Sequence, residues 1–129
     1  MITNPPPPNL NANFAVVLGS GESALTTGSS IVFRLKEAVT LTGIELSTLG
    51  GTGSCVLDIW ADTYANLNPT VADTITASAK PTISSAIKYQ DNTLTGWTKT
   101  FAAGTYFLVK IDSVSTFTQI TLNFLATRS

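Results

Sequence analysis

The residues that could do chemistry gather between positions 58 and 81 of this 129-residue chain. Asp58, Asp62 and Asp73 lie there with Trp60 and Tyr64, in a protein that has only 8 acidic residues. Carboxylates beside aromatic rings could serve a glycosidase, which needs two acids facing each other across a sugar. In a continuous strand Asp58 and Asp62 would share a face at about 13 Å, which is too far for such a pair. We therefore predict no catalytic residue and no enzymatic activity.

The same acids could instead bind a metal ion. Asp58, Asp62, Asn66 and Asp73 offer the oxygen atoms that calcium prefers, but they do not follow the compact Asp-x-Asp-x-Asp-Gly loop. Asp and Asn side chains also accept hydrogen bonds from nearby backbone N–H groups and so stabilise turns. Asp62 and Asp73 each precede a threonine, which suits that role. We predict turn-making at the end of a strand, no metal and no cofactor, with calcium as the alternative.

Several reaction and ligand classes are excluded by composition. The chain has no histidine, so Ser-His-Asp catalysis, Cys-His catalysis and most zinc sites are ruled out. The single cysteine, Cys55, excludes an internal disulfide, and its apolar surroundings in "SCVLDIW" predict a buried, inert thiol. With a net charge of −1 and 7 basic residues spread along the chain, nucleic acid is not an expected partner.

Neither the N-terminus nor any apolar run of the sequence indicates a signal peptide or a membrane-spanning segment. The N-terminus, "MITNPPPPNL", has neither the basic start nor the apolar stretch of a signal peptide. No apolar run approaches the length that crosses a bilayer. We expect a soluble protein, synthesised in the cytoplasm, without membrane insertion.

The elements that must position these residues are predicted to be strands. Only 12 % of the residues are charged, and threonine and serine supply much of the polar surface, which suits pleated strands better than helices. Apolar alternation, with turns between the runs, predicts strands over residues 14–18, 31–36, 39–49, 54–62, 86–90, 94–101, 106–112 and 117–127. Gly43 interrupts one run, as a β-bulge does. The pattern predicts an all-β, antiparallel β-sandwich or jelly roll.

The last two runs, joined by the short turn "SVST", are predicted to form a hairpin. Both are apolar on both faces in their middles, which is typical of strands covered on both sides. A partner copy could provide one of these covers. The residues predicted for such a homotrimer interface are Tyr106, Leu108, Phe117 and Leu125.

Residues 1–13 are predicted to form an extended N-terminal arm before a single domain at 14–129. Pro5, Pro6, Pro7 and Pro8 favour polyproline II and lack the N–H groups of a central strand. Such an arm is either a spacer or a segment that lies on a neighbouring protein, because stiffness lowers the entropic cost of docking.

A family resemblance enters at Asp58. The matching elements are "DIW", "DTYAN", "PTVADTI", "KPT", "QDNTLTGW" and "AAGT", with "ITLNFLATR" at the end and "SALTTG" upstream. Over about residues 14–128 the chain resembles a small β-domain of tailed-bacteriophage virion surface proteins. Ala61 stands where that family often has lysine, and "NLNP" occupies a variable segment. The resemblance implies a β-sandwich on the virion surface, assembled as a trimer.

Two functions follow from this resemblance. The first is a non-enzymatic capsid decoration protein, whose partners would be its own copies and the major capsid protein or another virion protein, with the arm prolines in contact with capsid or neighbour. The alternative is a receptor-binding module at a tail-fibre tip, where Trp60, Tyr64 and Trp97 would anchor a host surface glycan or protein.

Overall fold

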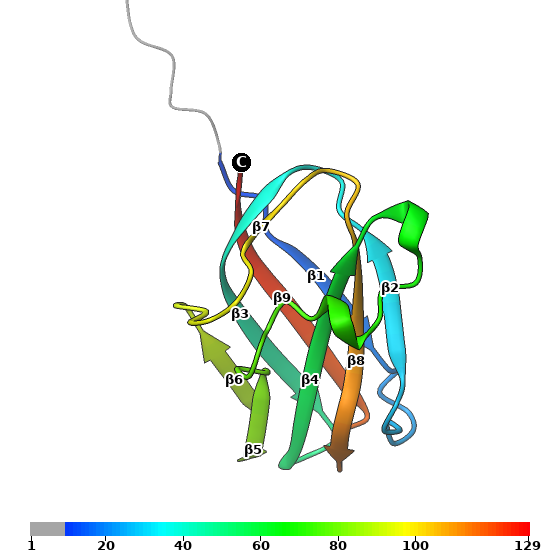
Figure 1. Cartoon of the computed structure of the whole chain (residues 1–129). Helices are drawn as coiled ribbons and strands as arrows, with labels where there is room; N and C mark the ends of the chain where they lie inside the picture. The colour runs from blue at the N-terminus through cyan, green and yellow to red at the C-terminus, as the bar shows by residue number, and fades with distance from the viewer. Residues whose placement is uncertain (1–9) are drawn as a thin grey trace, which may run out of the picture.

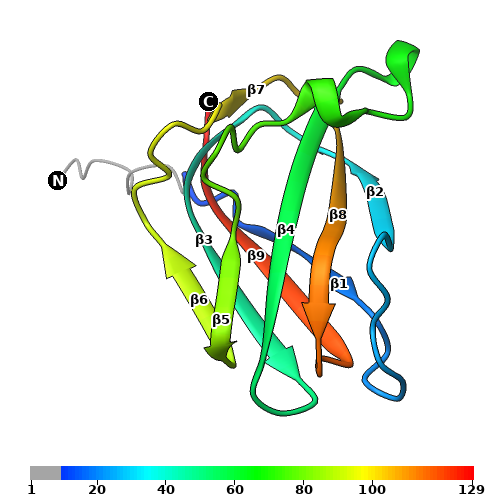
Figure 2. The same ribbon diagram turned by 60° about the horizontal axis from the view of Figure 1, so that its bottom comes forward.

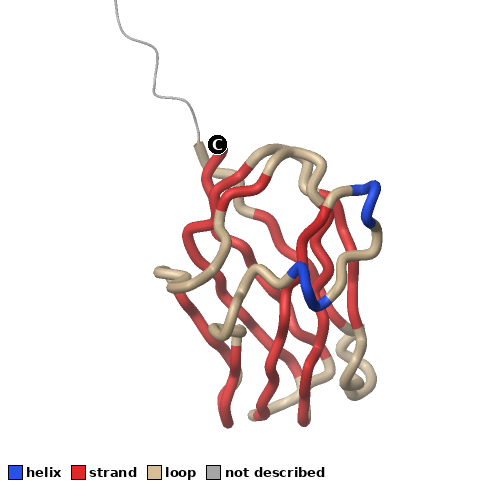
Figure 3. The backbone as a smooth tube through the Cα atoms, in the orientation of Figure 1, coloured by secondary structure: helices blue, strands red, loops and turns tan. Residues whose placement is uncertain are grey.

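The computed structural model of the chain describes residues 10–129. Within them the strands form two antiparallel sheets that face each other across one core (Figure 1). The strands are β1 (Phe14–Leu18), β2 (Ser30–Arg34), β3 (Val39–Leu49), β4 (Gly53–Asp62), β5 (Thr82–Ala86), β6 (Lys88–Asp91), β7 (Thr100–Phe101), β8 (Tyr106–Ser115) and β9 (Gln119–Arg128). Two short 3-10 helices, η1 (Tyr64–Asn66) and η2 (Val71–Asp73), lie between β4 and β5 (Figure 3).

The order of the strands defines a jelly roll. Sheet A has the order β1-β9-β3-β6, with β7 beside β3, and sheet B has the order β2-β8-β4-β5 (Figure 2). The chain passes from one sheet to the other between β1 and β2, β2 and β3, and β3 and β4. Two four-strand rows joined by such crossings are the arrangement of a jelly roll. The prediction of an all-β sandwich or jelly roll is confirmed.

The predicted hairpin of the last two strands is wrong. β8 pairs with β2 and β4 in sheet B, whereas β9 pairs with β1 and β3 in sheet A. The short turn between them carries the chain across the core, and Thr118 N–H donates to the Leu49 carbonyl at 2.9 Å. The connection is short because it spans one sandwich thickness, and alternation alone cannot distinguish that crossing from a hairpin.

Alternation along the strands builds the core. Phe107, Val109 and Ile111 of β8 are fully buried, and so are Ile120, Leu122 and Phe124 of β9. Phe107 and Phe124 meet edge to face, with ring centroids 5.7 Å apart. Each such side chain stabilises the fold by roughly 1.5–3 kcal/mol through its burial.

The sequence predicts one irregularity of the strands correctly and one strand wrongly. The register of β3 against β9 shifts between Leu41 and Gly43, which confirms the predicted bulge. The predicted strand over 94–101 is wrong except for Thr100–Phe101. Asp91 Oδ1 accepts the Leu94 N–H at 3.1 Å, and Leu94 adopts a φ of 51°, so this segment turns instead of extending.

The domain begins before Phe14. Asn11 forms a bridge with Thr127, and Ala12 N–H donates to the Ala126 carbonyl at 3.0 Å. Residues 10–13, assigned to the arm from the sequence, thus continue sheet A. Pro5, Pro6, Pro7 and Pro8 lie outside the described residues, so their contact with capsid or neighbour stays a prediction.

Candidate functional site

The outer face of sheet B holds most of the residues singled out in the sequence. Antiparallel register places three rows across this face: Arg34, Tyr106 and Asp62; Val32, Leu108 and Trp60; and Ser30, Lys110 and Asp58. The segment between β4 and β5 runs along the same side, and its Thr74 bridges to Trp60 (Figure 1). The face therefore combines a polar network with an aromatic surface.

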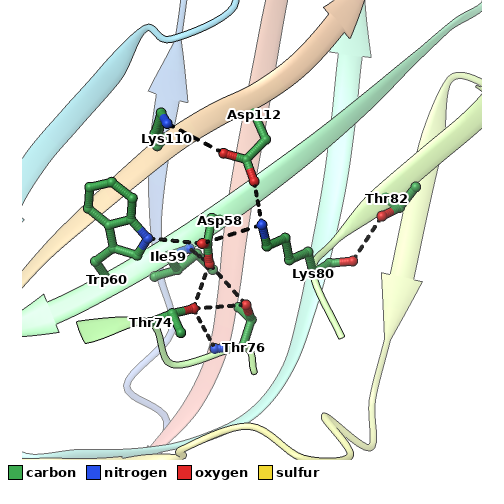
Figure 4. A network of polar contacts seen from close by, with 9 residues as sticks. All are labelled: Asp58, Ile59, Trp60, Thr74, Thr76, Lys80, Thr82, Lys110 and Asp112. Atoms are coloured by element: carbon green, nitrogen blue, oxygen red, sulfur yellow. Dashed lines mark hydrogen bonds and ion pairs between the residues drawn. The ribbon is translucent and has the colours of Figure 1, made fainter. Parts of the chain in front are cut away.

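Asp58 is the centre of the polar network. Its side chain lies in the middle of β4 and is almost completely buried, at 1 % exposure. Oδ1 accepts hydrogen bonds from Thr74 Oγ1 at 2.7 Å, Thr76 Oγ1 at 3.0 Å and the Ile59 N–H at 2.8 Å (Figure 4). Oδ2 accepts one from the Trp60 indole N–H at 2.9 Å. Every donor is local or comes from the covering segment, so the buried charge is solvated by protein.

Two lysines and a second acid complete the network. Lys80 Nζ lies 3.7 Å from Asp58 Oδ2 and donates to Asp112 Oδ2 at 2.7 Å. Lys110 Nζ lies 3.8 Å from Asp112 Oδ1 and 5.5 Å from the centre of the Trp60 ring (Figure 4). Sequence reasoning missed Lys80 and Asp112. The available signal was an aspartate inside the apolar run "VLDIW", because a buried carboxylate requires nearby donors or a cation.

The network keeps its carboxylate charged. Burial of Asp58 opposes ionisation, but the hydrogen bonds from Thr74, Trp60, Thr76 and the Ile59 N–H outweigh it and lower its pKa below the usual value. The hydrogen bond to Asp112 raises the pKa of Lys80, and the charges of Asp112 and Asp58 add to this effect. Both shifts favour the charged forms, so Lys80 forms ion pairs that join the covering segment to sheet B.

This arrangement suits structure better than reaction chemistry. A general acid at neutral pH needs a raised carboxyl pKa, and the pKa of Asp58 moves in the opposite direction. Its two oxygens already accept four hydrogen bonds. Within residues 10–129 no group of three or more Cys, Asp or Glu side chains is placed to hold a metal ion.

The other two acids behave as the turn prediction expects. Asp62 Oδ1 accepts the Thr63 N–H at 2.7 Å and the Asn66 amide at 3.1 Å, and these two hydrogen bonds lower its pKa. Asp73 Oδ2 accepts the Thr70 N–H at 2.8 Å and closes a capping box at η2. The prediction is wrong for Asp58, which lies mid-strand and is buried. Asp62 interacts with Asn66 and Asp73, whereas the oxygens of Asp58 are enclosed by Thr74, Thr76 and Trp60, so the four predicted oxygen donors do not form one group.

Beside the network lies an aromatic patch, made up of Val32, Trp60, Tyr64, Tyr106 and Leu108. Tyr64 is 71 % exposed, and its ring centroid lies 5.7 Å from that of Tyr106. Val32 is 41 % exposed, whereas Leu108 is 9 % exposed between Val32 and Trp60. Trp60 is half-buried, and its indole N–H is already held by Asp58. The patch therefore combines the Trp60 ring, which is held by Asp58, with the exposed ring of Tyr64 and two aliphatic side chains.

Two predicted site residues lie in the core instead of on this surface. Trp97 is 7 % exposed and donates its indole N–H to the Ala79 carbonyl at 2.9 Å, so it offers no anchor to a ligand. Phe117 is fully buried within one copy and cannot contribute to a subunit interface. Tyr106 and Leu125 lie on the outer faces of opposite sheets, so the predicted interface residues do not form one surface.

Cys55 lies in the core at 1 % exposure, as predicted. Burial raises its thiol pKa, which makes the reactive thiolate scarcer at neutral pH. The described part of the chain also contains no helix with the length and apolar character needed to span a membrane.

Comparison with known proteins identifies the fold. No family model matches the chain, and no curated protein matches its sequence. Among solved structures, the chain is similar to a chain of the capsid of Ralstonia phage GP4, with a TM-score of 0.55 and 13 % identity over 99 % of this chain and 92 % of that one. Lower likenesses include the K3 cleaved adhesin domain of Lys-gingipain from Porphyromonas gingivalis (TM-score 0.48, 14 % identity, 92 % and 74 % covered). The catalytic domain of a GH87 alpha-1,3-glucanase gives a TM-score of 0.40 and 15 % identity, covering 89 % of this chain but 22 % of that one.

Proposed function

We propose that this chain is a non-enzymatic structural protein of a tailed-phage virion, placed on the capsid surface as a decoration protein. The observation that carries the proposal is the likeness to a chain of the Ralstonia phage GP4 capsid, which extends over 99 % of this chain. The likeness also covers 92 % of that chain, so the matching protein consists almost entirely of this one domain. A likeness that spans nearly the whole of a chain from a phage capsid favours a place on the capsid over the end of a tail fibre.

The chemistry of the outer face supports the same role. Asp58 has a lowered pKa and saturated oxygens, and Lys80 locks the covering segment to Asp112 on β8. These contacts hold the segment between β4 and β5 against sheet B. A protein that strengthens a shell needs a rigid body with surfaces for its neighbours, and we propose that it acts as a homotrimer bound to the major capsid protein.

The receptor-binding function at a tail-fibre tip is the second candidate. It is favoured by Tyr64, which is 71 % exposed beside Tyr106 on a surface segment. Exposed aromatic side chains on loops are common anchors for glycans and proteins. In this function, Tyr64→Ala would abolish adsorption of the phage to its host and leave particle assembly unchanged.

Location on the particle distinguishes the two functions. A cryo-electron microscopy reconstruction of virions that carry this protein should show a jelly-roll domain of its size over the capsid lattice. Gold-labelled antibodies against the purified protein should then mark heads. Label confined to tail tips would overturn decoration in favour of receptor binding, and absence from purified virions would overturn both.

A further inference from the structure

The aromatic patch is an exposed apolar surface with the features of a peptide-binding site. Across the described residues, eight large apolar side chains are strongly exposed, and four of them, Val32, Tyr64, Leu67 and Val71, lie on sheet B or on the segment between β4 and β5. Tyr64 stands over Tyr106, and the next row across the sheet holds Val32, Leu108 and Trp60. The exposed Arg34 lies in the row of Tyr106, and Lys110 Nζ lies over the Trp60 ring, 5.5 Å from its centre.

We propose that the aromatic patch of one copy binds the proline segment, Pro5–Pro8, of a neighbouring copy. Four consecutive prolines favour a polyproline II helix, which loses little entropy when it binds. Its flat rings pack against Tyr and Trp side chains, which line the sites that recognise such helices. The chain itself therefore contains a segment whose chemistry matches its aromatic patch.

Hydrogen-bond chemistry favours the same occupant. A run of prolines offers carbonyl oxygens and no N–H groups, so a partner surface must supply donors. The patch supplies the hydroxyl groups of Tyr64 and Tyr106, and the guanidinium of Arg34 lies in the same row as Tyr106.

The point at which the arm leaves the domain favours a neighbouring copy over the same copy. Leu10 is fixed at the end of sheet A, where its carbonyl accepts the Arg128 N–H at 2.9 Å. The patch belongs to sheet B, whose strands β2, β8 and β4 are labelled in Figure 2. Four consecutive prolines favour an extended and stiff segment, and such a segment does not readily reverse its direction.

Exchange of arms would close a ring. Each copy offers one proline segment and one patch, so the contact is heterologous, and a closed heterologous contact gives cyclic symmetry. Three copies form the homotrimer of the proposed function, on which this inference rests only for the number of subunits. The patch would then be covered by arms in the assembled protein.

Cross-linking between two singly substituted full-length proteins tests the contact. One protein carries Asn4→Cys beside the prolines, and the other, of different mass through a tag, carries Ala65→Cys beside Tyr64. The native Cys55 lies in the core at 1 % exposure and does not compete. The matched control replaces Ala65→Cys by Thr52→Cys, an exposed position in the turn between β3 and β4 at the opposite end of the sandwich (Figure 2).

After subunit exchange and treatment with a short bismaleimide, we expect several-fold more mixed dimer with Ala65→Cys than with Thr52→Cys. Replacing Pro5–Pro8 by serine in the Asn4→Cys protein should reduce the yield to that of the control, and so should adding Tyr64→Ala to the Ala65→Cys protein. Equal yields at the two positions, or a yield that survives the serine substitution, would overturn the proposal. A chain carrying both Asn4→Cys and Ala65→Cys that cross-links within itself at high dilution would also overturn it, because the arm would then bind its own copy.

The outcome is independent of where the protein sits on a particle, because the experiment uses purified protein in solution. A reconstruction with the domain on capsids together with failed cross-linking would retain the proposed function and reject the arm exchange. Successful cross-linking, together with gold label only on tail tips, would retain the arm exchange and reject the decoration function.

Discussion

The outer face of sheet B carries Val32, Leu108 and Trp60 in a row across three strands, whereas a row of sheet A carries Ala15, Asn123 and Glu45. Both faces are made by alternate residues of antiparallel strands. Sheet A leaves Asn123 and Glu45 half-buried, but sheet B buries a carboxylate and displays aromatic rings. The same pleated backbone geometry therefore carries a buried polar network and exposed rings on sheet B but not on this row of sheet A.

The long segment between β4 and β5 accounts for the difference. It brings Thr74, Thr76 and Lys80 over sheet B, and these residues supply most of the side-chain donors around Asp58. Glu45 on sheet A has no such cover and remains only half-buried. An acidic residue on a strand becomes a structural centre when a neighbouring segment encloses it and provides its hydrogen-bond partners.

The largest effect should come from Asp58→Asn. An amide at this position presents an NH2 group to donors, and the Thr74, Thr76 and Trp60 groups lose a charged acceptor. We expect a loss of about 3 kcal/mol in the free energy of unfolding, measured by urea denaturation at pH 7. Asp62→Asn at the end of the same strand is the matched control and should cost much less, because this side chain lies at an exposed turn. Equal losses in both variants would contradict the central role of Asp58.

Lowering the pH should remove the contribution of the Asp58 carboxylate to stability in the native protein itself. The pKa of Asp58 is lowered in the folded state, so its contribution is complete above the unfolded pKa of about 3.9 and disappears as pH falls through the folded value. The difference in stability between the native protein and Asp58→Asn should therefore shrink as the pH is lowered from about 5 to 2. Denaturation curves recorded across this range measure it, and a difference that grows in acid would show that the carboxylate is not stabilised by folding.

Lys80→Met should have a smaller effect. The substitution keeps most of the apolar stem but breaks the ion pair with Asp112 and the 3.7 Å approach to Asp58. Because the lysine side chain is 38 % exposed, solvent screens these pairs, and we expect a loss of about 1 kcal/mol. Lys88→Met on the exposed edge strand β6 of sheet A is the comparison and should cost less. Thermal unfolding at two salt concentrations would show whether the Lys80 effect is electrostatic.

The smallest effect on a single copy, and the sharpest difference between faces, should come from two valines. Val32 on sheet B and Val17 on sheet A are 41 % and 46 % exposed. Replacing either by threonine should change the stability of the fold by less than about 0.5 kcal/mol. Because Val32 belongs to the aromatic patch, Val32→Thr should weaken self-association, whereas Val17→Thr should not. Sedimentation velocity over a concentration series measures this, and equal behaviour of the two variants would place the interface elsewhere.

Prediction from sequence succeeded where the cause is local. The strand over 39–49, the bulge at Gly43 and the buried Cys55 follow from alternation, from a glycine that breaks it, and from apolar neighbours. Asp62 and Asp73 make turns with residues one to four positions away. These features depend on contacts within a few residues, so the order of side chains contains the necessary information.

Prediction failed where the cause is distant along the chain. Asp58 looked like a turn residue because its partners Thr74, Thr76 and Lys80 follow 16 to 22 positions later. Trp97 looked exposed because nothing near it shows that the Ala79 carbonyl would accept its N–H. Phe117 looked like an interface residue because its burial comes from both sheets closing over the turn that it occupies.

By itself, the sequence determined an all-β domain, because branched and alternating side chains choose the pleated strand residue by residue. It also determined that histidine-dependent chemistry is absent and that a proline segment precedes the domain. Only the tertiary structure decided which strands pair, that β8 and β9 belong to different sheets, and that Asp58 is buried and charged. The reason is physical: strand pairing and burial depend on groups brought together from distant positions, and many such arrangements satisfy the same alternation.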